Sequence, residues 1–117
     1  MNIATQRPTV EVTGSNIDTL LASETPVLLD FWASWCVPCM LMKRTIEKAA
    51  LALDSRVTVG LVNIDEQPEI VERFSVRGTP TFLVVNHGRP VGAFTGMASS
   101  STIVRQVESA LAPGSAR

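Results

Sequence analysis

The chain has 117 residues, and 45% of them are hydrophobic. This length suits one globular domain, which we place over residues 1–117. The 10 Lys and Arg nearly balance the 11 Asp and Glu, which excludes a basic field for nucleic acid, and no apolar run approaches the roughly 20 residues that cross a membrane.

Residues 1–8 have no charged lead followed by an apolar core, so we expect no secretory signal. Two cysteines are too few for the disulfide scaffold of a small secreted protein. We therefore expect a cytoplasmic protein, in which a closely spaced cysteine pair is more often metal-binding or catalytic than structural.

The first third of the chain alternates between strand and helix patterns. Residues 9–12 alternate like a short strand, and Ser15 with Asp18 three residues later resembles a capping pair for a short helix. Residues 27–33 are apolar apart from Asp30, which is typical of a strand covered on both faces, as in a parallel sheet. We expect this strand at the centre of the sheet.

A long amphipathic helix is predicted from residue 37 onward. Its apolar residues recur at helical spacing, namely Met42, Ile46, Ala49, Ala50 and Leu53. The preceding strand therefore delivers two cysteines, Cys36 and Cys39, to the first turn of this helix. The unpaired N–H groups and the positive dipole end of that turn would stabilise a thiolate at Cys36.

Another strand and a short helix follow in the middle of the chain. Residues 56–64 are rich in β-branched apolar residues, which predicts a second buried strand. Residues 65–68 supply acids and a proline where a helix should begin. This short helix should end near residues 76–78.

The last third of the chain predicts a hairpin and a final helix. Strands at 81–85 and 90–94 are joined by a turn at 86–89. Pro90 cannot donate a hydrogen bond to a neighbouring strand, so the second strand should lie at an edge of the sheet. A helix with one apolar face follows Ser101.

The Cys-x-x-Cys pair has several interpretations. Zinc prefers four ligands, and beyond the pair the chain offers only His87 as a soft or borderline ligand. His87 lies in a turn beside Gly88, where a solvated residue is expected, and zinc held between two copies of the chain stays a minor alternative. A purely structural disulfide is disfavoured because so small a loop removes little chain entropy.

Several segments together resemble the thioredoxin family. Residues 30–39 resemble its active-site segment, residues 62–65 its central strand, and residues 77–81 its cis-proline loop. Gly88 and Gly96 fit a later turn and a groove glycine of that family.

The resemblance covers about residues 9–112 in order and spacing, with frayed ends outside this core. It implies a thioredoxin fold of the α/β class, with a central mixed sheet of about five strands flanked by about four helices. It also implies an enzyme, a thiol–disulfide oxidoreductase that reduces protein disulfides through a mixed-disulfide intermediate. Electron transport and cell redox homeostasis would be its cellular roles.

The resemblance assigns roles to three residues. Cys36 would be the exposed nucleophile that forms the mixed disulfide, and the more buried Cys39 would resolve it. Asp30 would accept the Cys39 proton, and the alternative is an acid that merely ends a strand at the surface. A carboxylate between Leu29 and Phe31 should have a raised pKa because burial disfavours its charge.

Partners follow from the same resemblance. The substrates would be protein disulfides, and a separate reductase of the thioredoxin reductase type would supply electrons. We expect no metal and no cofactor beyond the redox-active cysteine pair. A bound dinucleotide in particular is not expected, because the chain has no G-x-G-x-x-G motif. We expect a monomer that binds neither nucleic acid nor a membrane.

A substrate groove is implied around the cysteines. X–Pro bonds are usually trans, so only the resemblance implies a cis bond at Pro80. The backbone of Thr79 would pair with an extended substrate segment, and Trp32 would pack against the active-site loop. The groove residues would be Trp35, Val37, Pro38, Gly78, Thr79, Pro80, Gly96 and Met97.

The helix after the cysteines departs from the family pattern. Val37 stands where the family usually has glycine, and Met40 stands where lysine is common, so less positive charge lies near the thiolate. Arg44 replaces a proline that usually kinks this helix, which predicts a straighter helix.

Two further departures concern the sulfur and the buried acid. Leu61 replaces a lysine, which should make Asp30 harder to ionise. Thr79 stands where isoleucine is common, and its hydroxyl could donate to the Cys36 sulfur. Because no histidine lies between the cysteines and Pro38 lacks an N–H, we predict a reducing or moderately reducing protein.

Two rival functions stay open at this level. One is an exported thioredoxin-like reductase or isomerase, which a signal or anchor upstream would favour. The other is a non-catalytic binding module that uses the fold as a scaffold. Replacing both cysteines with serine distinguishes redox exchange from binding.

Overall fold

A sheet of five strands organises the computed structural model, which describes residues 8–114. The strands are β1 (Thr9–Glu11), β2 (Val27–Trp32), β3 (Thr58–Asn63), β4 (Thr81–Asn86) and β5 (Arg89–Thr95). They lie in the order β1-β3-β2-β4-β5. The frayed ends predicted for the chain fall mainly on residues 1–7 and 115–117, which lie outside the described range.

The sheet is mixed, as the resemblance implied. Strand β3 runs parallel to both β1 and β2, whereas β4 is antiparallel to β2 and to β5. Strand β2 is therefore the central strand, and its burial on both faces confirms the prediction made from its apolar sequence.

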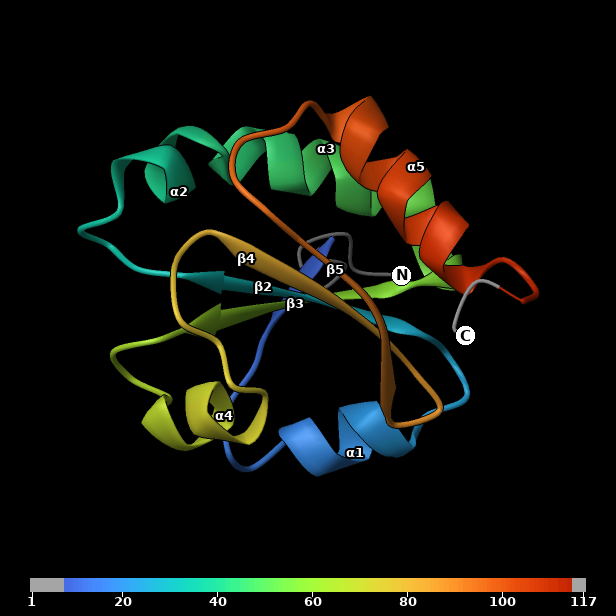
Figure 1. The fold of residues 1–117 in the computed structure, drawn as a ribbon, viewed down its shortest axis with the longest axis horizontal. Helices are drawn as coiled ribbons and strands as arrows, with labels where there is room; N and C mark the ends of the chain where they lie inside the picture. Colours follow the sequence, from blue (N-terminus) through green and yellow to red (C-terminus); the bar gives the residue numbers. More distant parts are fainter. Residues whose placement is uncertain (1–7, 115–117) are drawn as a thin grey trace, which may run out of the picture.

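Helices cover both faces of this sheet (Figure 1). The helices are α1 (Ile17–Ala22), α2 (Val37–Leu41), α3 (Lys43–Leu53), α4 (Pro68–Arg73) and α5 (Ser100–Leu111). In the view of Figure 1, α1 and α4 lie below the sheet, and α2, α3 and α5 lie above it. A short 3-10 turn at Asp54–Arg56 leads from α3 toward β3.

Successive residues of β2 enter two different cores, because side chains alternate between the faces of a strand. Leu28 packs with Ile46 of α3 in the upper core, which lies between the sheet and helices α3 and α5. Phe31 packs with Ile70 of α4 in the lower core, which lies between the sheet and helices α1 and α4. Asp30 shares the face of Leu28, so the strand directs its carboxylate toward the α3 layer.

The helix after the cysteines is broken at Met42, and the prediction of one straighter helix is wrong. Met42 has φ -90° and ψ 0° and separates α2 from α3. Its N–H is shared between the carbonyls of Pro38 and Cys39, each at 3.2 Å, a tightening common at helix ends. The break thus comes from the last turn of α2 itself, and it forms although position 44 is Arg44 and not a proline.

The start of α1 also differs from the prediction, because Asn16 and not Ser15 is its N-cap residue. The Asn16 side chain accepts from the Thr13 N–H at 2.9 Å and donates to the Glu11 carbonyl at 2.8 Å. Asp18 instead forms an ion pair with Arg73 of α4 at 2.8 Å. These bonds tie the loop before α1 to β1 and α1 to α4, so no capping pair forms.

The hairpin between β4 and β5 forms as predicted. His87 and Gly88 make the turn with φ values of 52° and 76°, the left-handed pair that a two-residue hairpin turn requires. His87 is exposed, which agrees with a solvated turn residue. Strand β5 lies at an edge of the sheet, and the pairing register shifts near Pro90.

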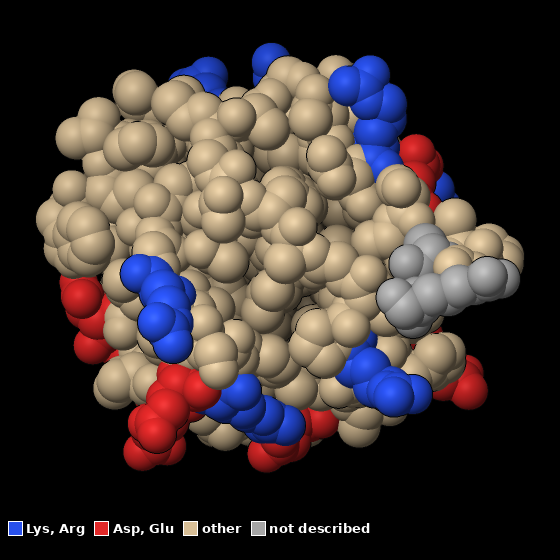
Figure 2. Space-filling model, in the orientation of Figure 1, with Lys and Arg blue, Asp and Glu red and all other residues tan. Residues whose placement is uncertain are grey.

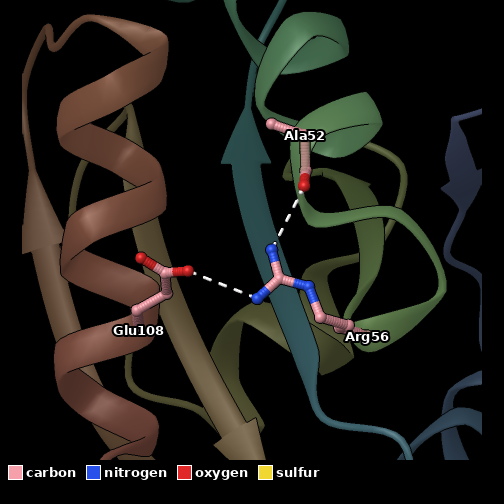
Figure 3. Close-up of polar contacts among 3 residues, drawn as sticks. All are labelled: Ala52, Arg56 and Glu108. Carbon is pink, nitrogen blue, oxygen red and sulfur yellow. Dashed lines mark hydrogen bonds and ion pairs between the residues drawn. The ribbon is translucent and has the colours of Figure 1, made fainter.

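Arg56 joins the end of α3 to α5 (Figure 3). Its guanidinium donates to the Ala52 carbonyl at 3.2 Å and to the Glu108 carboxylate at 3.3 Å. The Arg56 and Glu108 side chains are 58% and 50% exposed, so the pair contributes about 1 kcal/mol or less to stability. The fully buried Leu53 and Ile103 between the same helices contribute more.

Close packing of α5 on β5 makes Gly92 a sensitive position. A Cβ at Gly92 would lie 2.7 Å from the Ala110 Cβ, and that atom cannot swing away because it is fixed to the α5 backbone. We expect Gly92→Ala to lower the free energy of unfolding by about 1–3 kcal/mol. Urea denaturation measures this change.

Gly14→Ala is the matched control, because a Cβ at Gly14 meets nothing within 4 Å. Its free energy of unfolding should stay equal or rise by less than about 1 kcal/mol. Equal losses in the two variants would show that close packing of α5 on β5 is not the cause.

Candidate active site

Loops from three strands meet at one end of the sheet. Phe31 of β2 pairs with Thr81 of β4, and Thr81 pairs with Thr95 of β5. Because β4 runs opposite to β2 and β5, the loop after β2, the loop before β4 and the loop after β5 leave the sheet together (Figure 1). The sequence segments with the cysteines, Pro80 and Gly96 are therefore brought to the same end.

The two cysteines are joined in a disulfide at the start of α2, and their Cα atoms are 5.2 Å apart. Cys36 is the N-cap residue of α2, and Pro38 lies in the first turn. The Cys36 Sγ accepts a hydrogen bond from the Cys39 N–H at 3.3 Å. The helix start thus directs an amide dipole at the sulfur of Cys36.

Both cysteines are buried in this oxidised form, which corrects one expectation. Cys36 is 5% exposed and Cys39 is 7% exposed, so Cys36 is not the more exposed residue of the pair. Their side chains form a small buried cluster with Ala33, against which Trp32 and Ile64 pack. The disulfide turns the Cys36 sulfur inward toward α2, where this cluster covers it.

The residues flanking the disulfide are exposed and uncharged. Trp35 is 65% exposed and Val37 is 67% exposed, and Met97 on the neighbouring loop is exposed as well. In the orientation of Figure 1, uncharged side chains fill most of the visible face, while Lys, Arg, Asp and Glu lie mainly around its rim (Figure 2). A partner that binds at the disulfide would meet apolar surface.

Asp65 holds the exposed Trp35 ring, a contact that the sequence analysis missed. The indole Nε1 of Trp35 donates to the Asp65 Oδ2 at 2.9 Å. The Asn63 side chain in turn accepts from the Asp65 N–H at 3.0 Å. Because β2 and β3 are parallel, the residues after both strands lie at one end of the sheet, and this topology could have pointed to Asp65.

Asp30 is buried, at 6% exposure, which excludes the alternative of a surface acid at a strand end. Burial raises its pKa from 3.8 to about 7, because the charged carboxylate loses its water. Its neighbours in the register are Leu61 on β3 and Phe82 on β4, and neither can offset the charge. The raised pKa predicted from the sequence is confirmed.

The loop before β4 contains a cis Thr79–Pro80 peptide bond, as the resemblance implied. Pro80 is buried, and its carbonyl accepts from the Gly96 N–H at 3.3 Å. Gly78, Thr79, Pro80 and Gly96 all line one open pocket of about 680 Å³. This pocket brings together half of the groove residues predicted from the resemblance.

The Thr79 hydroxyl does not reach the sulfur in this form. Among residues 8–114, the hydrogen bond to the Cys36 Sγ comes from the Cys39 N–H alone, so the bond considered between Thr79 and Cys36 is not formed.

Within residues 8–114, no group of three or more His, Cys, Asp or Glu side chains is placed to hold a metal ion. Over the same range, no helix is both long and apolar enough to cross a membrane.

Comparisons with known proteins agree with this geometry. The thioredoxin family model matches residues 8–109. A thioredoxin of Alicyclobacillus acidocaldarius subsp. acidocaldarius is 35% identical over 88% of this chain and 98% of its own length. Thioredoxins of Chlorobaculum thiosulfatiphilum and Mycobacterium bovis are 34% and 33% identical, over 84% and 85% of this chain and 92% and 86% of their own lengths.

The residues that the family model matches include both cysteines, the cis-proline loop and all five strands of the described sheet. The chain belongs to the thioredoxin family, and it is a thiol–disulfide oxidoreductase.

Proposed function

We propose that this protein reduces disulfides of other proteins by dithiol–disulfide exchange. The Cys36 thiolate attacks one sulfur of the substrate disulfide, forms a mixed disulfide and expels the other substrate sulfur as a thiolate. The Cys39 thiolate then attacks the Cys36 sulfur, which restores the Cys36–Cys39 disulfide and releases the second substrate thiolate. Two electrons pass from the cysteine pair to the substrate.

The observation that carries this proposal is the hydrogen bond from the Cys39 N–H to the Cys36 Sγ at the start of α2. A bond of this kind becomes stronger when its acceptor is charged. The free N–H groups of the first helical turn add to the effect. Cys36 is therefore the better nucleophile of the pair and attacks first.

Asp30 is the proposed proton acceptor for Cys39. It is a buried carboxylate whose pKa of about 7 is close enough to neutral pH for it to take up and release a proton there. In this proposal the carboxylate takes the Cys39 proton, through a water molecule, before Cys39 attacks the mixed disulfide.

The residues of the proposed substrate groove are uncharged. Half of its residues line the pocket beside the cis-proline loop, and an extended substrate segment would pair there with the Thr79 backbone. The exposed side chains around the disulfide would contact apolar substrate residues. The proposed groove consists of Trp35, Val37, Pro38, Gly78, Thr79, Pro80, Gly96 and Met97.

The proposed cellular role follows from this chemistry. The protein works as one domain and a monomer, without a metal or an organic cofactor, and it takes electrons from a separate reductase of the thioredoxin reductase type. The proposed location is the cytoplasm, where the protein takes part in electron transport and cell redox homeostasis. These statements rest on the family and on the features described above.

Cysteine variants test the order of attack, because the chain has two cysteines in all. Cys36→Ser should reduce insulin no faster than dithiothreitol alone, since the nucleophile is gone. Cys39→Ser should instead accumulate a mixed disulfide with insulin through Cys36, because nothing resolves it. Mass spectrometry of the trapped species checks the assignment.

Ser34→Ala is the control for the cysteine variants, because Ser34 is an exposed neighbour to which the proposal gives no part in the exchange. It should keep the full rate of insulin reduction. A mixed disulfide that accumulates in Cys36→Ser would reverse the two roles, and full activity in Cys36→Ser would refute the redox function.

Asp30→Asn tests the proton acceptor. It should slow resolution of the mixed disulfide on the order of 100-fold or more at neutral pH, because the carboxylate that takes the Cys39 proton is removed. Stopped-flow measurement of substrate thiol release gives this rate. An unchanged rate would exclude Asp30 as acceptor.

The same variant has a predicted effect on stability. Between pH 3.8 and about 7, the folded protein keeps a proton on Asp30 that the unfolded chain has lost, so the stability of the protein falls as pH rises through this window. Above pH 7 the loss is complete and amounts to about 4 kcal/mol. Relative to the parent protein, Asp30→Asn should therefore gain about this much between pH 4 and pH 8 in urea unfolding.

Equilibration with glutathione tests the reducing direction. A reducing pair should become oxidised by an excess of oxidised glutathione, and a pair that stays reduced would contradict the proposal. Pro38→His should need more oxidised glutathione, because an imidazole beside Cys36 stabilises its thiolate. Alkylation of free thiols followed by mass spectrometry measures the oxidised fraction.

A further inference from the structure

A cavity of about 280 Å³ lies between α3 and the parallel half of the sheet, and Asp30 is part of its wall. Thr9, Trp32 and Leu61 line it from the sheet. Lys43 and Glu47 line it from α3. The buried carboxylate is thus connected by open space to two charged side chains that are exposed to solvent.

The strands beside Asp30 supply no cation. Asp30 pairs in register with Leu61 on β3 and with Phe82 on β4. Both neighbours are apolar, so a positive charge that assists Asp30 has to come from the helix layer above the strand.

Lys43 is the charged group placed to do so. Its Nζ lies 5.7 Å from the centroid of the Trp32 ring, close enough for a cation–π contact. Trp32 and Asp30 are two residues apart on β2 and therefore share a face of the sheet. The flexible four-carbon stem of a lysine allows its ammonium group to move between the ring and the cavity.

No opposite charge holds Lys43 elsewhere. Within the described range, the ion pairs are Arg56 with Glu108 and Arg73 with Asp18, so Lys43 and Glu47 are both outside them. Lys43 is one helical turn from Glu47, and the two side chains lie on the same wall of the cavity.

The other charges near this cavity are acidic. An adjoining cavity of about 550 Å³ shares Thr9, Trp32 and Leu61 with the first one and adds Glu11 and Glu66 to its wall. Among residues 8–114 that line these two cavities, Lys43 is the single cation. The carboxylates of Glu11, Glu47 and Glu66 disfavour ionisation of Asp30. The positive charge of Lys43 opposes their effect.

We propose that Lys43 is a positioning residue that favours the ionised form of Asp30, and that the cavity beside it carries the proton between Asp30 and solvent. This proposal rests on the proposed role of Asp30 as the acceptor of the Cys39 proton. The thiol gives its proton to the carboxylate, the carboxylic acid releases it to water in the cavity, and Lys43 keeps Asp30 ready to accept again. Glu47 acts in the opposite sense.

Titration of Asp30 in the oxidised full chain tests the proposal without any use of activity. The ¹³C signal of the Asp30 carboxyl group reports its protonation. Lys43→Met should raise the pH midpoint of Asp30 by about half a pH unit or more, because a favourable charge is lost. Glu47→Gln should lower it, and Lys43→Arg should leave it nearly unchanged.

Lys48→Met is the matched control, because Lys48 is an exposed lysine of the same helix that does not line the cavity. It should leave the Asp30 midpoint unchanged. The double variant with Lys43→Met and Leu61→Lys places a cation on the strand beside Asp30 and should bring the midpoint back down. Equal effects of Lys43→Met and Lys48→Met would overturn the proposal.

The rate of mixed-disulfide resolution against pH separates the two proposals. In Lys43→Met, the midpoint of this profile should move to higher pH together with the Asp30 midpoint. If the Asp30 midpoint moves and the rate profile does not, Asp30 is not the acceptor of the Cys39 proton, and the role of Lys43 in the exchange fails with it. If neither moves, the role of Lys43 fails and that of Asp30 still rests on Asp30→Asn.

Discussion

Strand β2 has a paired strand along each edge and helices over each face, and this enclosure determines both parts of the active site. It removes water from Asp30, so that the carboxyl group titrates near neutral pH and not near its ordinary value. It also anchors the chain directly before the cysteine loop. The sulfur of Cys36 can therefore meet the first N–H groups of α2 in a fixed arrangement.

The chemistry of the site divides between an exposed and an enclosed part. On the outside, Trp35, Val37 and Met97 offer exposed apolar side chains, and the exposed Asp65 carboxylate fixes the large indole ring. On the inside, Asp30 faces a cavity whose charged residues come from α3. Because Leu61 of β3 is apolar, the positive charge near Asp30 comes from Lys43 of α3 and not from the neighbouring strand.

Hydrophobic spacing in the sequence was enough to predict the strands, the central place of β2 and the buried state of Asp30, because these depend on which residues avoid water. The same spacing hid the break in the helix after the cysteines. Met42 and Ile46 keep helical spacing across it, and the Ile46 N–H still donates to the Met42 carbonyl at 2.8 Å. The N-cap at Asn16 depends on side-chain bonds to Thr13 and Glu11 that hydrophobic spacing does not record. The bond from Trp35 to Asp65 joins segments 30 residues apart, which no local pattern records.

The two edge strands of the sheet, β1 and β5, are poorly suited to pair with a strand of another chain. Strand β1 is three residues long, and β5 carries a proline and an interrupted register. Within residues 8–114, neither edge strand presents a long, regular row of free amides and carbonyls with which another strand could pair. Over the part of the chain that the structure describes, the two edge strands therefore offer little for pairing with a strand of a second chain.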